Sequence, residues 1–252
     1  MDLRKLFLLL AALVILFLQP LWERPKLNPE LPPGGNFDLT AFKLQLPVAQ
    51  EGRMQEILPA VLAGRQGFTN SYFYTDRQDG SMTMMVPKTG AVSPNSRHCR
   101  TELREMTEGW LPFGVHTLEA TVRVTQVQNH TVLGQIYQAG AVHKPLCLLA
   151  YFADGTVKLI LNRDPAGGEA VTTEVAKVQP GAQFKYVLEL SDLNLAVNVD
   201  GRTTNLQVPL VYGGKKFYFK AGNYDQDSQA GPVATLPDAE VHFYQLALKH
   251  QG

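Results

Sequence analysis

Tyr218-Phe219-Lys220-Ala221-Gly222-Asn223-Tyr224-Asp225-Gln226 is the stretch of this chain that says most about its fold. Side chains of a β-strand alternate between two faces, so a strand here places four polar residues on one face: Tyr218, Lys220, Tyr224 and Gln226. The opposite face is apolar and carries Phe217, Phe219 and Ala221. We therefore predict a sheet strand with one face on a hydrophobic core and the other presented to an anionic ligand.

The composition of the whole chain is consistent with one large β-domain. The chain has 252 residues, of which 45% are apolar, enough for a substantial core. Formal net charge is zero, so nothing global indicates binding to nucleic acid or to a membrane surface. A site for a polyanion must therefore concentrate its cations locally.

The N-terminal residues predict export. Arg4 and Lys5 precede an unbroken apolar run over residues 6–18, the pattern of a secretory signal. The run is shorter than the ~20 residues of a membrane span. No small-x-small cleavage site follows it. Residues 1–24 are thus either a signal peptide or an N-terminal membrane anchor, with a possible tether through residues 6–22, and the domain is secreted or periplasmic.

Beyond the leader, residues 25–35 are rich in proline and glycine and predict a linker, followed by one domain over residues 36–252. Asp-Gly pairs separate runs with strand character and predict tight hairpins in which both residues have positive φ: Asp79-Gly80, Asp154-Gly155 and Asp200-Gly201. Only Met54 to Leu62 suggests a helix, which Pro59 interrupts. The fold class is all-β: an antiparallel β-sandwich of jelly-roll, concanavalin-like type.

The two cysteines, Cys99 and Cys147, are too few for a disulfide framework, and no CxxC spacing indicates a metal site. Two buried thiols are the preferred interpretation, and one disulfide between them is the alternative.

Two further segments alternate polar and apolar residues. Along Cys99 to Met106, one face carries Arg100, Glu102 and Arg104. Taken alone, this is typical of a solvated edge strand, yet an Arg-Glu-Arg row can also hold a guanidinium ready for a carboxylate. Gln135 and Tyr137 share a face of a third strand. If all three strands line one concave sheet, the groove suits a linear acidic polysaccharide. Neighbouring cations can lower the pKa of a tyrosine, which would let it transfer protons.

These motifs resemble those of the alginate lyases of polysaccharide lyase family 7. The family's Arg-Ser/Thr-Glu-Leu-Arg motif corresponds to Arg100–Arg104, and its Tyr-Phe-Lys-Ala-Gly-x-Tyr-x-Gln motif to Tyr218–Gln226. The opening Phe37–Val48 is also similar, so the resemblance covers roughly Phe37 to Lys249. It implies a jelly roll with the site on the concave sheet, no cofactor and no metal.

The resemblance also implies residue roles in a β-elimination of 4-linked uronates. Arg100 and Gln135 would neutralise the uronate carboxylate, and Tyr224 would transfer protons, ending as the acid toward the O4 leaving group. The remaining groove residues would bind the chain or hold the catalytic groups: Glu102, Arg104, Tyr218, Lys220 and Gln226. We expect an acidic polysaccharide as the partner, no nucleic acid, and a monomer.

One position departs from the family pattern. The third family motif is Gln-Ile/Val-His, and Tyr137 occupies the place of its histidine. In the family that histidine is thought to help neutralise the carboxylate and to take an anti C5 proton, as in guluronate. Without it, Tyr224 would serve as base and acid on a syn proton, which favours mannuronate. Tyr137 could keep the carboxylate hydrogen bond through its hydroxyl.

Several alternatives remain open. The domain could cleave another polyuronate such as glucuronan, could bind acidic glycans without cleaving them, or could have lost activity. Endo and exo action are not distinguished. Four histidines are possible substitutes for the missing one: His98, His116, His130 and His143. His98 could lie at the groove edge, His116 is expected to be structural, and the other two are expected on the surface.

Overall fold

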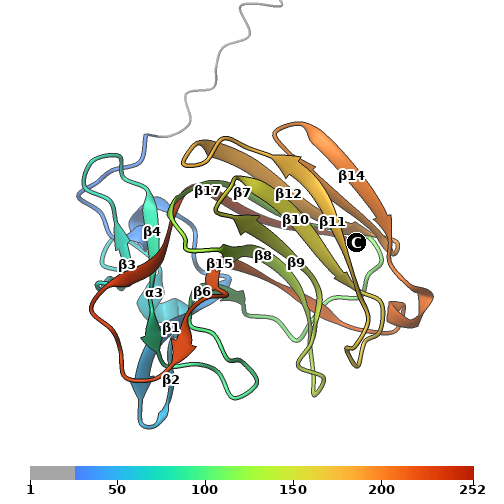
Figure 1. The fold of residues 1–252 in the computed structure, drawn as a ribbon, viewed down its shortest axis with the longest axis horizontal. Helices are drawn as coiled ribbons and strands as arrows, with labels where there is room; N and C mark the ends of the chain where they lie inside the picture. The colour runs from blue at the N-terminus through green and yellow to red at the C-terminus, as the bar shows by residue number, and fades with distance from the viewer. Residues whose placement is uncertain (1–25) are drawn as a thin grey trace, which may run out of the picture.

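A computed structural model describes residues 26–252, and the predicted signal or anchor, residues 1–24, lies outside them. Two antiparallel sheets pack face to face (Figure 1). The first sheet has, in spatial order, β11 (Ala170–Lys177), β10 (Thr156–Asn162), β9 (Pro145–Phe152), β8 (His130–Gln138), β15 (Phe217–Asp225), β6 (Arg100–Glu105), β1 (Phe42–Gln50) and β2 (Arg53–Ile57). The second has β14 (Arg202–Gln207), β13 (Asn194–Val199), β12 (Gln183–Ser191), β7 (Val115–Gln126), β17 (Pro237–Gln251), β4 (Met82–Pro87) and β3 (Phe73–Thr75). A small parallel pair joins β5 (Thr89–Gly90) to β16 (Gln229–Ala230).

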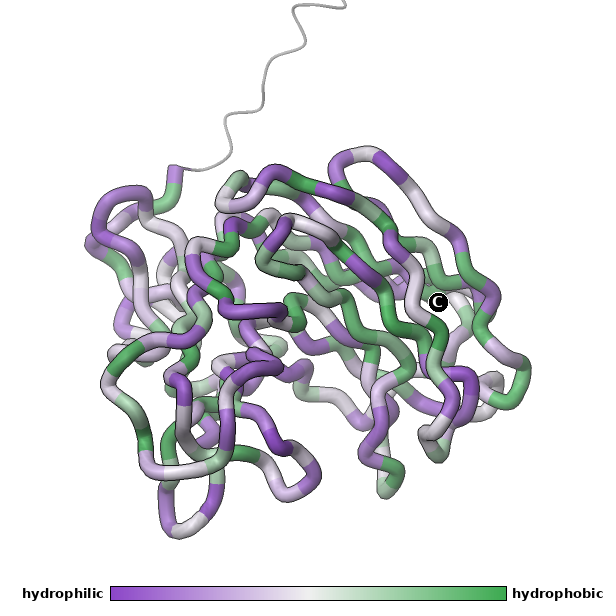
Figure 2. Tube along the Cα trace, viewed as in Figure 1, coloured by the Kyte–Doolittle hydropathy of each residue, from purple (hydrophilic) through white to green (hydrophobic). Residues whose placement is uncertain are grey.

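The core lies between the two sheets, because alternate residues of each strand point inward. Phe219 and Ala221 of β15 are fully buried there, opposite inward residues of the second sheet such as Leu188 and Phe243. Figure 2 shows hydrophobic segments along the strands and hydrophilic ones in many of the loops. The predicted all-β sandwich is confirmed. Among residues 26–252, no helix is long and apolar enough to cross a bilayer.

The Asp-Gly pairs all lie in turns, but only Asp200-Gly201 has positive φ at both residues (47° and 86°). At the other two pairs only the glycine is left-handed, because those turns are longer: Gly80 N–H bonds to Asp76 and Gly155 N–H to Phe152. The expectation of positive φ at both residues was therefore wrong for two of the three hairpins.

The predicted helix over Met54 to Leu62 is also wrong in its first half. Arg53–Ile57 is the edge strand β2, and Pro59 begins the one-turn helix α3 (Pro59–Leu62) instead of interrupting a longer one. Proline is favoured at a first helical position, where no backbone N–H is needed. Two other short elements complete the fold of residues 26–252: the one-turn helix α2 (Pro33–Asn36) and the 3₁₀ turn η1 (Leu210–Tyr212).

The end of the predicted linker packs on the domain. Gly34 in α2 is buried, its carbonyl accepts the N–H of Gly64 at 2.9 Å, and a Cβ there would lie 2.3 Å from the carbonyl oxygen of Leu62. Cys99 and Cys147 are both buried free thiols, as preferred from the sequence.

Strand β15 occupies the middle of the first sheet, between β6 and β8. Its register aligns Lys220 with Arg104 on one side and with Gln135 on the other. A bulge between Ala221 and Tyr224 lies beside Gly222, where a Cβ would come within 2.6 Å of the Glu102 Cα. The three polar rows expected from the sequence are thus neighbours on one sheet face.

Candidate active site

A groove of about 830 Å³ lies on the outer face of the first sheet, over β2, β1, β6, β15, β8 and β9. Its lining contains five cationic side chains: Arg53, Arg100, Arg104, Lys144 and Lys220. Glu56 is the one carboxylate of that lining. A chain of zero net charge has therefore concentrated positive charge in one groove, as a polyanion site requires.

Glu102 lies beneath this groove and is fully buried. Its Oε2 accepts from Arg100 Nη1 at 2.9 Å and from Lys220 Nζ, and its Oε1 accepts from the Gln135 amide. One carboxylate from β6 therefore holds a guanidinium, an ammonium and an amide from three adjacent strands. We call these four residues, Arg100, Glu102, Gln135 and Lys220, the Glu102 network.

The charges within this network shift each other's ionisation. Burial alone would raise the pKa of Glu102, but Lys220 and Arg100 hold it below its ordinary value, so the carboxylate stays ionised. Burial lowers the pKa of Lys220 to about 7, with Arg100 acting in the same direction and Glu102 opposing it. The charge of Lys220 is therefore responsive to pH near neutrality.

Both arginines of β6 stack on tyrosines of β15. The guanidinium carbon of Arg100 lies 3.7 Å from the ring centroid of Tyr224, and that of Arg104 lies 4.4 Å from that of Tyr218. Among residues 26–252, neither Arg100 Nε nor Arg104 Nε has a hydrogen-bond partner, although both atoms are buried. Stacking orients each planar fork and leaves N–H donors for an incoming carboxylate.

Tyr224 borders the same groove. Its hydroxyl lies 2.9 Å from Ser96 Oγ, and its backbone carbonyl accepts from Gln226 Nε2 at 3.0 Å. Gln226 itself lines the groove just beyond the end of β15. The Tyr224 hydroxyl thus lies in the groove that Arg100, Gln135 and Lys220 also line.

Known proteins are similar to this chain in sequence and in fold. The family profile described as alginate lyase matches residues 37–250. The chain belongs to the alginate lyase family. A Klebsiella pneumoniae protein described as alginate lyase is 28% identical over 284 residues, covering 86% of this chain and 91% of that protein.

Solved structures agree. Alginate lyase A1-II', a member of polysaccharide lyase family 7, is 31% identical, with a TM-score of 0.78 over 87% of this chain and 99% of that one. Alginate lyase PA1167 of Pseudomonas aeruginosa is 26% identical, with a TM-score of 0.75 over 85% of this chain and 100% of that one. The expected family and the jelly-roll fold are confirmed.

Tyr137 takes an unexpected role in this lyase. Its ring lines the groove near Tyr218 and below Lys220, but its hydroxyl donates to the backbone carbonyl of His143 at 2.8 Å. The hydroxyl proton is thus donated to the β8–β9 loop and not held free for a carboxylate in the groove. Burial raises the pKa of both Tyr137 and Tyr218 and outweighs the nearby arginines, so the expected lowering does not occur at these two tyrosines.

The four histidines divide as follows. His116 stacks on Trp110 at 4.2 Å and bonds to the Phe113 carbonyl, so it is structural as expected. His130 stacks on Phe152, away from the groove lining. His98 Nδ1 bonds to the Ser228 carbonyl at 2.7 Å. His143 is exposed in the β8–β9 loop, as expected, and it also lines the groove.

Several groove residues were missed from the sequence. Glu56 of β2 accepts from Lys43 Nζ at 2.6 Å and from Gln45 Nε2 at 2.9 Å, and it was hidden by the helix assigned to that segment. Ser96 lies in a loop, where no strand alternation marks it. Its only signal was its place four residues before the arginine motif.

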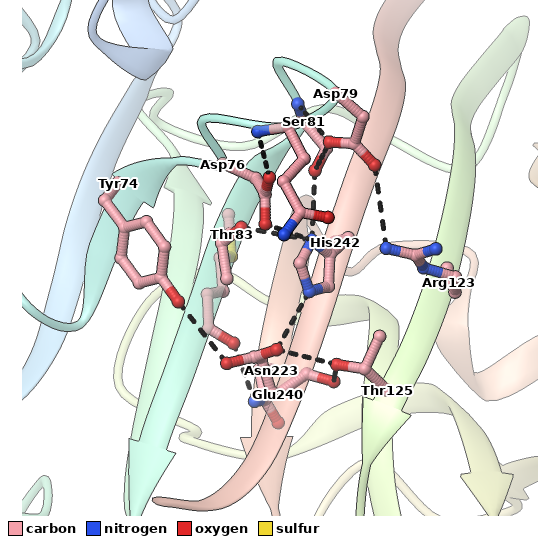
Figure 3. A network of polar contacts seen from close by, with 12 residues as sticks. Tyr74, Asp76, Asp79, Ser81, Thr83, Arg123, Thr125, Asn223, Glu240 and His242 are labelled. Atoms are coloured by element: carbon pink, nitrogen blue, oxygen red, sulfur yellow. Dashed lines mark hydrogen bonds and ion pairs between the residues drawn. The ribbon is translucent and has the colours of Figure 1, made fainter. Parts of the chain in front are cut away.

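A second polar network lies on the second sheet, around the buried His242 of β17 (Figure 3). His242 Nε2 contacts Glu240 Oε1 at 2.9 Å, and Nδ1 lies 3.0 Å from Ser81 Oγ and 3.2 Å from Thr83 Oγ1. Asp76 Oδ2 is 4.0 Å from Nδ1. We call this set the His242 network; it consists of Asp76, Asp79, Ser81, Thr83, Glu240 and His242.

Asp76, Asp79 and His242 are also close enough to hold a metal ion, with ligand atoms within 4.8 Å of one another. Hydrogen bonds already occupy both Asp79 oxygens and His242 Nδ1, however. Asp79 Oδ1 accepts from the Ser81 hydroxyl at 2.6 Å, and Asp79 Oδ2 accepts from the Tyr244 hydroxyl at 2.8 Å. The cluster is accounted for as a clamp between the β3–β4 turn and β17.

Proposed function

We propose that this groove cleaves alginate by β-elimination, with Tyr224 as both base and acid and with a preference for mannuronate. One observation carries the proposal. The Tyr224 hydroxyl borders the same groove as the Arg100 and Gln135 donors that Glu102 holds in place.

The chemistry follows from what a uronate needs. The C5 proton lies α to a carboxylate, and its loss builds negative charge on that carboxylate. Arg100 and Gln135 supply N–H donors held in position by Glu102, so they stabilise the charge without reorganising. Removal of the C5 proton forms the C4–C5 double bond as the C4–O4 bond breaks, and the departing O4 takes a proton from Tyr224.

The mannuronate preference rests on the geometry around Tyr137. Its hydroxyl donates to the His143 carbonyl. Tyr218 also lines the groove, but its ring lies under Arg104 and burial raises its pKa, so Tyr224 is the candidate proton carrier. A single residue that removes the proton and protonates the leaving oxygen works from one face of the sugar. Syn elimination, which mannuronate requires, meets that condition.

Location outside the cytoplasm is also proposed, supported by the charged start and apolar run of residues 1–18. A polymeric uronate as substrate is consistent with action outside the cell. Expression of the full chain followed by fractionation, with mass measurement of the mature N-terminus, tests both export and cleavage.

The catalytic proposal is tested by adding purified full-length protein to polymannuronate, polyguluronate and glucuronan separately. Ultraviolet absorbance of the new conjugated double bond should rise fastest with polymannuronate. Tyr224→Phe should lower kcat by at least ~100-fold, the loss expected for a general acid–base group. Faster turnover of polyguluronate would contradict the preference for mannuronate. Faster turnover of glucuronan would show that glucuronan, and not alginate, is the substrate. Tight binding with no absorbance change identifies a glycan-binding module.

A further inference from the structure

Ser96 makes three contacts that together determine where its proton lies. Its Oγ is 2.9 Å from the Tyr224 hydroxyl, 2.9 Å from the backbone carbonyl of His98 and 3.1 Å from the backbone N–H of His98. A carbonyl only accepts and an N–H only donates. Ser96 therefore gives its one proton to the His98 carbonyl and accepts from the N–H, and its remaining lone pair accepts the Tyr224 proton.

We propose that Ser96 is the positioning residue of Tyr224, holding the phenol by accepting its proton and holding the phenolate by donating to it. The change requires only rotation of the Ser96 O–H from the His98 carbonyl to the phenolate oxygen. The inference rests on the proposed function, because it assigns Ser96 to the elimination that Tyr224 carries out.

The two orientations of the Ser96 O–H correspond to the two protonation states that Tyr224 adopts during the reaction. Attack requires Tyr224 in its phenolate form, with its proton released to solvent, and the Ser96 O–H and the Arg100 guanidinium 3.7 Å from the ring centroid stabilise that form. The phenolate takes the C5 proton, the C5–H electron pair forms the C4–C5 double bond, and the C4–O4 bond breaks. The phenol then gives that proton to O4, so the phenolate returns and no net proton is consumed within the site.

The loop that carries Ser96 is tied to the segment that follows Tyr224. Ser96 N–H donates to the Ser93 carbonyl at 2.9 Å, His98 Nδ1 bonds to the Ser228 carbonyl at 2.7 Å, and the N–H of Cys99 donates to Ser228 Oγ at 2.9 Å. The Ser228 N–H is in turn held by Asp225, the residue next to Tyr224. These bonds fix Ser96 relative to Tyr224, as a positioning role requires.

The test compares Ser96→Ala, Ser96→Thr and the control Ser71→Ala on the full chain with polymannuronate, because Ser71 is exposed and lies outside the groove lining. Loss of one hydrogen bond to a charged oxygen should lower kcat of Ser96→Ala by about 10-fold to about 100-fold and change KM less than twofold. The rising limb of its pH–rate profile should move to higher pH, because the phenolate has lost a donor. Ser96→Thr keeps a hydroxyl and should recover most of kcat, and Ser71→Ala should match wild type.

A second measurement is independent of turnover. Ultraviolet difference titration of wild type against Tyr224→Phe isolates the ionisation of Tyr224, and the same difference in the Ser96→Ala background should lie at higher pH. Unchanged kcat and an unchanged titration would overturn the proposal, as would a rise in KM at constant kcat. If wild type cleaves no polyuronate, the proposed function fails, whereas the titration still decides whether Ser96 stabilises the phenolate. Unfolding midpoints of all variants detect any that are misfolded.

Discussion

The Glu102 network on the first sheet and the His242 network on the second are built from similar parts in opposite arrangement. In the first, one buried carboxylate is surrounded by Arg100, Lys220 and the Gln135 amide. In the second, one buried imidazole is surrounded by carboxylates and hydroxyls, with Glu240 at 2.9 Å and Ser81 at 3.0 Å. Both bridge strands that are distant in sequence.

The two networks differ in how far the hydrogen-bonding capacity of their side chains is used within the protein. Arg100 and Gln135 use part of their donors on Glu102, and the Nε of Arg100 has no partner among residues 26–252. The carboxylates of the His242 network are instead taken up by hydroxyls, backbone N–H groups and Arg123. Hydrogen-bond donors that stay free beside an open groove are available to a ligand. The same kinds of groups hold two segments together when their hydrogen bonds are formed within the protein.

The largest expected effect comes from removing the central anion of the groove. Glu102→Gln leaves Arg100 and Lys220 buried without their counter-charge, which should lower the free energy of unfolding by about 3 kcal/mol. Misplaced donors should also lower kcat/KM by at least ~100-fold. Urea unfolding and the double-bond absorbance assay measure the two effects.

The matched variant in the other network is Glu240→Gln. Its side chain is 25% exposed and keeps one acceptor oxygen, so the free energy of unfolding should fall by only about 1 kcal/mol. Activity on polymannuronate should be unchanged. Equal losses of activity in both variants would show that the two networks are not functionally distinct.

An intermediate effect is expected from Arg104→Lys. Lysine keeps the charge but loses the planar fork stacked on Tyr218, so KM for polymannuronate should rise about 10-fold with little change in kcat. The control is Arg123→Lys in the seven-stranded sheet, where Arg123 contacts Asp79 at 3.6 Å and lies over Tyr244. A large kcat effect of Arg104→Lys would instead place Arg104 in the chemical step.

The smallest expected effect is a change with pH. The pKa of Lys220 is lowered to about 7, so the groove loses one cation as pH rises through that value, and KM should increase. Lys220→Met should raise KM below pH about 7 to the value that wild type shows above it, and so remove this dependence. Because the unfolded chain binds that proton more tightly, the contribution of Lys220 to stability rises with pH above about 7.

The His242 network should affect the free energy of unfolding at acid pH. The pKa of Glu240 is held below its ordinary value by its hydrogen bond from His242, despite burial. The contribution of Glu240 to stability is therefore present above its pKa in the unfolded chain. It is lost as the pH falls through its pKa in the folded protein. Glu240→Gln should flatten the acid limb of the unfolding profile and leave the dependence of KM on pH unaltered; a shift in KM would contradict the separation.

Much of the site could be predicted because it lies on strands. The rows Arg100–Arg104, Gln135–Tyr137 and Tyr218–Tyr224 alternate regularly, and the structure places all of them on one face. Ser96 could not be found in this way, because a loop residue has no periodic neighbour pattern. Glu56 was lost because an edge strand ending before Pro59 was taken for the start of a helix.

By itself, the sequence determined the all-β class, the family and the polar face of β15, since alternation and turn residues are local properties of the chain. Only the tertiary structure decided how the charges pair. Glu102 meets Lys220 and Gln135 because β6, β15 and β8 are neighbours in this register, and Tyr137 is turned to His143 because a loop folds back over it. Pairing and burial set the charge of each group, and both depend on strands that are distant along the chain.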